Sequence, residues 1–100
     1  MKYVILKIEI TEGVYKAFPY IFCDHDTHSV VAEYMKHMLM KEMKKEAVVH
    51  SAGFCSPDSE GMFTCYRGSE TLKIPSEKVS HKDDSRLLSF IDSTAGVMYD

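Results

Sequence analysis

Six consecutive residues, Cys23-Asp24-His25-Asp26-Thr27-His28, contain five side chains of the types that bind metals or transfer protons. Neighbouring residues on one loop rarely converge on one ion, and a transition-metal site needs distant partners as well, here His50 or His81. The same segment has what the first turn of a helix requires, namely short polar side chains and carboxylates near the positive end of the dipole. We therefore predict a helix cap with one histidine packed against the sheet, and no metal site.

A second polar group, Tyr66-Arg67-Gly68-Ser69-Glu70-Thr71, places an aromatic ring, a guanidinium and hydroxyl groups around one glycine. An arginine fork holds a phosphate or carboxylate with two hydrogen bonds, a neighbouring ring stacks on a base, and glycine exposes backbone N–H groups. The competing interpretation is a solvated hairpin turn. The candidate ligand-binding residues are Tyr66, Arg67, Ser69 and Thr71, joined by His28 and Lys36 if the preceding helix crosses this end of the sheet.

Catalytic patterns have no support in the sequence. The cysteines, Cys23, Cys55 and Cys65, are odd in number and lack C-x-x-C spacing, which favours reduced thiols in a reducing compartment. Cys55 and Cys65 could nevertheless face each other across a hairpin. The chain has no G-x-G-x-x-G, Walker or H-E-x-x-H motif. We predict a protein that is not an enzyme and uses no metal or cofactor.

Length and charge limit the remaining classes. One hundred residues with 45% hydrophobic and 27% charged content predict a single domain over residues 1–100. A net charge of -3 disfavours bulk binding to nucleic acid. No apolar run reaches the ~20 residues of a membrane span, and the first residues do not resemble a signal peptide, so a cytoplasmic location is expected.

The elements that must position these groups follow from hydrophobic periodicity. Residues 27–45 form the only long helical pattern, and the apolar side chains predicted to face the core are Val30, Val31, Tyr34, Met35, Met38 and Leu39. Period-two alternation and strand-forming residues predict strands at residues 3–10, 14–22, 48–54, 62–67 and 71–74. Gly13 suits a turn with positive φ, and Pro19 indicates a bulge or a sheet edge.

A short helix is predicted to begin near Asp83, with Leu87, Leu88 and Ile91 on its apolar side, and residues 93–100 are expected to be a loosely held tail. The order is ββαβββα. It predicts an α+β fold with an antiparallel-leaning sheet of about five strands, one long helix on a face and a short C-terminal helix. Tyr3, Ile5, Tyr15 and Tyr66 would then need cover on the other face, which predicts a homo-oligomer.

Most of the chain resembles a group of small uncharacterised tailed-phage proteins. The similar segments are residues 2–4, 18–22, 28–32, 48–54, 64–72 and 83–88. The chain departs from that group by His50, inserted before Ser51-Ala52-Gly53, and by a longer loop from Pro75 to Lys82. No catalytic residue carries over from the resemblance.

The resemblance implies an anti-defence protein that acts in the host cytoplasm. Two modes are open: sequestration of a small nucleotide-like immune signal, which the polar turn favours, and direct inhibition of a host defence protein, as anti-CRISPR proteins do, which the acidity favours. We expect the first. A structural or accessory phage protein is a further alternative, and a metal-dependent hydrolase would rest on residues 23–28 alone.

Overall fold

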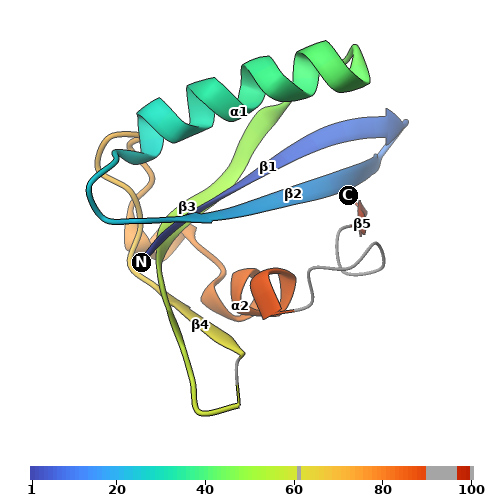
Figure 1. The fold of residues 1–100 in the computed structure, drawn as a ribbon. Helices are drawn as coiled ribbons and strands as arrows, with labels where there is room; N and C mark the ends of the chain where they lie inside the picture. The colour runs from blue at the N-terminus through green and yellow to red at the C-terminus, as the bar shows by residue number, and fades with distance from the viewer. Residues whose placement is uncertain (61, 90–96, 100) are drawn as a thin grey trace.

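The computed structural model describes residues 1–60, 62–89 and 97–99, and shows an α+β fold with a helix on each face of one antiparallel sheet (Figure 1). The strands are β1 (Lys2–Thr11), β2 (Val14–Phe22), β3 (Val48–Pro57), β4 (Phe63–Tyr66) and β5 (Val97–Tyr99), in the order β4-β3-β1-β2-β5. The helices are α1 (His28–Met43), α2 (His81–Ser89) and a 3-10 turn η1 (Ser76–Lys78). Neither α-helix of the described chain has the length and apolar content of a membrane span.

The central strand, β1, is buried on both faces. Val4, Leu6 and Ile8 pack on the side of α1, whereas Tyr3 and Ile5 pack on the side of α2, so that the predicted alternation is confirmed. Leu87 and Leu88 of α2 belong to the same cluster as Tyr3 and Ile5. The expectation that these two side chains need a partner subunit is therefore wrong, because the chain covers them itself.

Three features of the sheet follow from single residues. Gly13 has a φ of 77° in the β1–β2 turn, as predicted. Pro19 lies opposite Ile5 of β1, outside the three residues of β2 that pair with β5. The register between β1 and β3 shifts at His50, and this additional residue keeps both Val49 and Ala52 on the α1 side.

The predicted helix over residues 27–45 is confirmed as α1, but the face predicted to be buried is only partly correct. His28, Ala32 and Leu39 are buried, whereas Val30 and Tyr34 are 62% and 63% exposed. The apolar residues of α1 cover more than half of its circumference, so that periodicity alone does not fix which of them meet the sheet. Ala32 is buried in the same cluster as Val4, Leu6 and Ile8 of β1.

The predicted strand at residues 71–74 is wrong. Ser69 and Ile74 form an isolated bridge with both backbone hydrogen bonds, and the four residues between them make a turn in which Lys73 has a φ of 57°. Leu72 and Ile74 still point inward, against the cluster under α1. The fifth strand is instead β5, in the expected tail; Ile91 and residues 93–96 and 100 of that tail lie outside the described residues.

Candidate ligand pocket

A pocket of about 680 Å³ lies at the end of the sheet where α1 begins. Residues of β1, β3, α1 and the segment between β4 and η1 line it: Lys2, His28, Phe54, Arg67, Gly68, Ser69, Glu70, Thr71, Lys73, Ile74, Pro75 and Ser76. The volume is in the range of pockets that bind small organic ligands and cofactors. The pocket is therefore large enough for a small molecule.

The floor of the pocket belongs to one row of side chains across four strands. The register places Tyr66, Phe54, Lys2 and Phe22 next to one another on β4, β3, β1 and β2. The Phe54 and Tyr66 rings stack at 6.0 Å, and the His28 ring meets Phe22 and Phe54 edge to face, each at 5.6 Å. Strand pairing thus assembles an aromatic surface from residues far apart in the sequence.

Positive charge surrounds this aromatic surface. The Lys2 ammonium and the Arg67 guanidinium lie 5.8 Å and 5.7 Å from the centre of the Phe54 ring. With Lys73 and the single lining carboxylate, Glu70, the formal charge of the lining is 3 - 1 = +2. Neither Arg67 nor Lys73 forms an ion pair with a carboxylate of the described residues. The cations are therefore available to an anionic ligand, in a protein whose net charge is negative.

Two glycines let the segment after β4 close over the sheet. A Cβ on Gly53 would lie 2.5 Å from the backbone oxygen of Arg67, and a Cβ on Gly68 would lie 2.1 Å from the backbone oxygen of Ile74. Both distances are shorter than any tolerated carbon–oxygen contact, so that a side chain at either position would push the segment away. Arg67 itself has a φ of 59°, which turns the chain from β4 into the pocket wall.

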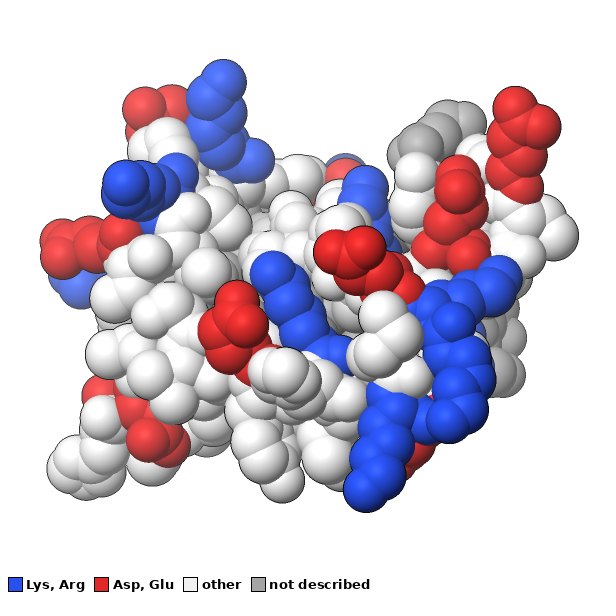
Figure 2. Space-filling model, turned by 90° about the horizontal axis from the view of Figure 1, so that it is seen from above, with Lys and Arg blue, Asp and Glu red and all other residues white. Residues whose placement is uncertain are grey.

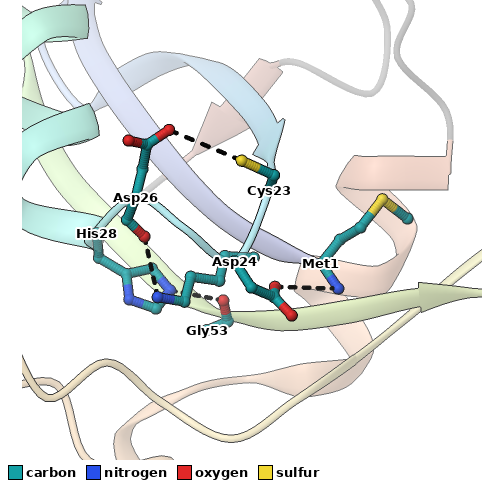
Figure 3. A network of polar contacts seen from close by, with 7 residues as sticks. Met1, Cys23, Asp24, Asp26, His28 and Gly53 are labelled. Carbon is teal, nitrogen blue, oxygen red and sulfur yellow. Dashed lines mark hydrogen bonds and ion pairs between the residues drawn. The ribbon is translucent and has the colours of Figure 1, made fainter.

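The first turn of α1 forms the opposite wall. Thr27 is the N-cap, and its hydroxyl accepts a hydrogen bond from the Val30 N–H at 3.3 Å. The Thr71 hydroxyl accepts another from the Ser29 N–H at 3.1 Å, which ties the turn after β4 to the helix. The predicted helix cap is thus confirmed, with Thr27 in the capping position, while Asp24 pairs with the N-terminal ammonium at 3.5 Å (Figure 3).

His28 is the histidine packed against the sheet. Its Nε2 lies 2.7 Å from the Gly53 carbonyl oxygen and, because a carbonyl only accepts, Nε2 carries the proton and donates it (Figure 3). Burial lowers the pKa of His28; the bond to Gly53 opposes this effect and the Lys2 ammonium adds to it. The ring is therefore held neutral, which leaves Nδ1 as a hydrogen-bond acceptor.

Of the six predicted site residues, the structure brings His28, Arg67, Ser69 and Thr71 together in the pocket lining. Tyr66 is not in the lining but stacks on Phe54. Lys36 lies outside the pocket, two turns along α1, with its ammonium 3.8 Å from Glu33.

Among the lining residues that were not predicted, three add a positive charge or an aromatic ring: Lys2, Phe54 and Lys73. Lys2 and Phe54 are paired by the β1–β3 register. That pairing depends on contacts between distant strands, so no local pattern reveals it.

The cysteines and acids suggest no second site. Cys55 and Cys65 lie opposite each other on β3 and β4, as the hairpin predicted, and both are free and buried. Burial raises the pKa of both thiols, that of Cys65 to about 12, which makes them poor nucleophiles. Within the described residues, no three His, Cys, Asp or Glu side chains are grouped so as to hold a metal ion.

Comparisons with protein-family models, curated proteins and solved structures found no match to the chain. The class that the fold and the pocket define is a small α+β domain with a cationic, aromatic-floored cavity at one end of its sheet.

Proposed function

We propose that the protein binds a small nucleotide-like anion in this pocket and acts by sequestering it, without converting it. The observation that carries the proposal is the placement of Arg67 beside the Phe54–Tyr66 pair in a cavity whose lining has a net positive charge. Arginine forks and lysines bind phosphate oxygens, and aromatic surfaces take up planar bases. A ligand that combines a phosphate with a base would use both features together.

Binding without turnover is supported by the roles that the polar groups already have. His28 donates to the Gly53 carbonyl, the Ser69 hydroxyl accepts from the Leu72 N–H, and the Thr71 hydroxyl accepts from the Ser29 N–H. These groups hold the walls of the pocket. A nucleophile needs a base beside it, and no hydrogen bond among the described residues joins the His28 ring to a hydroxyl or thiol of the lining.

The biological setting is proposed from the resemblance to tailed-phage proteins. In an infected cell, a protein that holds a nucleotide-like immune signal would keep it from the host effector that it activates. Sequestration requires only that the protein be abundant and bind the signal more tightly than its effector does. Direct inhibition of a host defence protein is the alternative, and the experiment below separates the two.

The first test is mass spectrometry of the small molecules that heat releases from protein purified out of cells with active nucleotide signalling. Release of an intact nucleotide supports sequestration. Release of a hydrolysed nucleotide would instead indicate an enzyme. An empty protein that captures a host defence protein would favour direct inhibition.

The second test is calorimetry with a panel of nucleoside monophosphates, cyclic nucleotides and inorganic phosphate. Loss of a charged hydrogen bond in Arg67→Ala should cost roughly 1.5–3 kcal/mol, about a ten- to hundredfold loss of affinity. The matched control is Arg86→Ala, which removes an exposed arginine from α2, outside the pocket lining. The free energy of unfolding of both variants should lie within about 0.5 kcal/mol of the parent's. If the affinity of Arg67→Ala stayed within about twofold of the parent's, the proposal that the ligand binds in this pocket would be wrong.

A further inference from the structure

Two buried thiols face each other between the last two strands at one end of the sheet. The β3–β4 register places Cys55 directly opposite Cys65, and both side chains belong to the buried cluster on the α2 side. β4 is the last strand of the order on this side, and it has four residues. A bond between the two sulfurs would therefore join this short strand covalently to the rest of the sheet.

The backbone hydrogen bonds identify the kind of cross-strand pair that the cysteines form. The Cys55 N–H donates to the Met1 carbonyl at 2.8 Å, toward β1, and the Cys65 N–H donates to the Ser85 hydroxyl at 2.9 Å, toward α2. In an antiparallel ladder, two opposed residues either exchange both of their backbone hydrogen bonds or none. Cys55 and Cys65 are therefore a non-hydrogen-bonded pair, the kind whose side chains lie closest together.

The spacing of such a pair suits a disulfide. Its Cα atoms are about 4.5 Å apart, and disulfides span Cα separations of about 4.4–6.8 Å with both Cβ atoms directed toward each other. Because the pair lies at the short end of this range, the bond forms with little movement of the backbone but is not relaxed. Disulfides of this kind are more easily reduced than relaxed structural ones, which favours a bond that forms and breaks.

We propose that Cys55 and Cys65 are a redox-sensitive pair, which a low-molecular-weight disulfide such as oxidised glutathione converts into a cross-strand disulfide that locks β4 to β3. One protein thiolate attacks a glutathione sulfur and releases one glutathione. The second thiolate attacks the protein sulfur of the mixed disulfide and releases the other. The protein loses two electrons and two protons, and oxidised glutathione gains them as two molecules of reduced glutathione. In reducing surroundings both thiols stay free, as in the structure.

Burial makes this oxidation slow. It raises the pKa of both thiols and so lowers the fraction of reactive thiolate. Figure 2 shows the side of the molecule that α1 covers, where charged side chains of both signs reach the solvent. The thiols of Cys55 and Cys65 lie on the other side of the sheet, packed with Leu87 and Leu88 of α2. A reagent therefore reaches them only when β4 and α2 separate locally, and the reaction must be followed to equilibrium.

The disulfide should reduce the opening of β4. Since cross-strand pairs alternate, the neighbouring pairs Phe54–Tyr66 and Ser56–Thr64 are the hydrogen-bonded ones. Amide hydrogen exchange at Thr64 and Tyr66 reports local separation of β4 from β3. A cross-link between the two pairs should slow this exchange by roughly tenfold or more. The effect requires no ligand, so the inference does not depend on the proposed function of the pocket.

The test uses the variant Cys23→Ser, because Cys23 is exposed and would react with glutathione on its own. The protein is equilibrated, from the reduced and from the oxidised side, at graded ratios of oxidised to reduced glutathione. Free thiols are then labelled with N-ethylmaleimide in denaturant and counted by mass spectrometry. We expect one transition from two labelled thiols to none. The ratio at its midpoint should be roughly tenfold or more lower for the folded protein than in urea, because the strands hold the thiols together.

The matched controls add Cys55→Ala or Cys65→Ala to Cys23→Ser, and circular dichroism verifies that they are folded. Each should form only a mixed disulfide with glutathione and show no slower exchange at Thr64 and Tyr66. Two labelled thiols at every ratio in the Cys23→Ser protein overturn the proposal, and so does a mixed disulfide that persists there. A midpoint ratio that is not lower in the folded protein than in urea overturns it as well, since the strands would then hold the thiols apart.

Discussion

Polar side chains are arranged differently on the two faces of the sheet. On the α2 face, the hydroxyls of Tyr3 and Ser51 both donate to one oxygen of Asp84, and all three side chains are buried. On the α1 face, Lys2 and Phe54 form the floor of an open pocket. They are neighbours of Tyr3 and Gly53, which pair with each other on β1 and β3. Alternation along β1 and β3 thus gives one sheet a buried, hydrogen-bonded polar cluster on one side and an open cationic site on the other.

The difference separates stability from binding. The α2-side cluster is buried, and burial makes its hydrogen bonds costly to lose. The pocket side carries cations without carboxylate partners among the described residues, and these contribute little to folding while remaining available to a ligand. Substitutions on the α2 face should therefore change stability, and substitutions in the pocket should change affinity.

The largest effect is expected for Asp84→Ala. The substitution leaves the Tyr3 and Ser51 hydroxyls buried without an acceptor, and each such loss costs about 1–3 kcal/mol. The free energy of unfolding should fall by about 2–6 kcal/mol, a large part of the 5–15 kcal/mol typical of a domain. Urea denaturation followed by circular dichroism measures the change.

The matched control for that prediction is Asp83→Ala. Asp83 is the preceding residue, exposed, and accepts a hydrogen bond only from the Ser80 hydroxyl at 2.9 Å among the described contacts. Its loss should cost about 1 kcal/mol or less. Equal destabilisation by the two variants would show that Asp84 acts through helix α2 in general and not through its buried cluster.

The next effect is the response of the α2 face to alkali. Burial raises the pKa of Cys65 to about 12, against 9.0 for an ordinary thiol, and burial together with Asp84 raises the pKa of Tyr3. Above pH 9 the unfolded chain releases the Cys65 proton while the folded chain keeps it. Stability is therefore complete below pH 9 and falls as pH rises toward 12, by at most about 1.4 kcal/mol per pH unit for this thiol.

Cys65→Ala isolates the contribution of the thiol. The substitution also weakens packing, but that loss does not depend on pH. Only the slope of the free energy of unfolding against pH therefore reports on the titration of the thiol. Chemical denaturation at pH 8, 9 and 10 should give a shallower decline for the variant than for the parent. Parallel declines would mean that the thiol titrates alike in the folded and unfolded chain.

Smaller effects, which stabilise the protein, are expected from substitutions at two lysines with positive φ. Lys73 lines the pocket and Lys44 ends α1, and both have a φ of 57°. Glycine relieves the strain at either position, so Lys73→Gly and Lys44→Gly should each gain about 0.5–1 kcal/mol of stability. Only Lys73→Gly should lower affinity for a phosphate-containing probe, roughly three- to tenfold, because it alone removes a pocket cation.

Melting curves and calorimetry on the two glycine variants test this pair. An equal loss of affinity in both would place the phosphate elsewhere. An unchanged affinity in both would exclude Lys73 from the site.

The sequence predicts the elements whose local pattern matches their final environment. Period-two alternation identifies β1, and Thr27 with the following periodicity identifies α1. Sequence patterns fail where contacts between distant residues decide the structure. Residues 71–74 have strand-forming side chains, yet the Ser69–Ile74 bridge closes them into a turn against α1, and the helix turns His28 rather than Val30 toward the sheet.

The candidate site shows the same difference between residues of one local turn and residues that meet through strand pairing. Arg67, Ser69 and Thr71 were found because turn chemistry is local and because glycine beside arginine is typical of an anion-binding turn. Lys2 and Phe54 were missed because they meet only through the register of antiparallel strands, 52 positions apart. Lys36 was included for its charge, and the pitch of α1 carries it away from the pocket.

The last effect concerns His28, whose buried ring lines the pocket. Its pKa is lowered, so below pH 6.5 the unfolded chain binds a proton that the folded chain does not. The stability that His28 contributes is therefore complete above pH 6.5 and is lost as pH falls, by at most about 1.4 kcal/mol per pH unit. His28→Gln keeps a donor for the Gly53 carbonyl and removes the titration, so its stability should decline less between pH 7 and 5 than that of the parent. The other four histidines are present in both proteins, and their contributions cancel in the comparison. Nitrogen-detected spectra of the ring should show a neutral Nε2–H tautomer that persists below pH 6.5, and a ring that becomes cationic above that pH would refute the assignment of Nδ1 as an acceptor in the pocket wall.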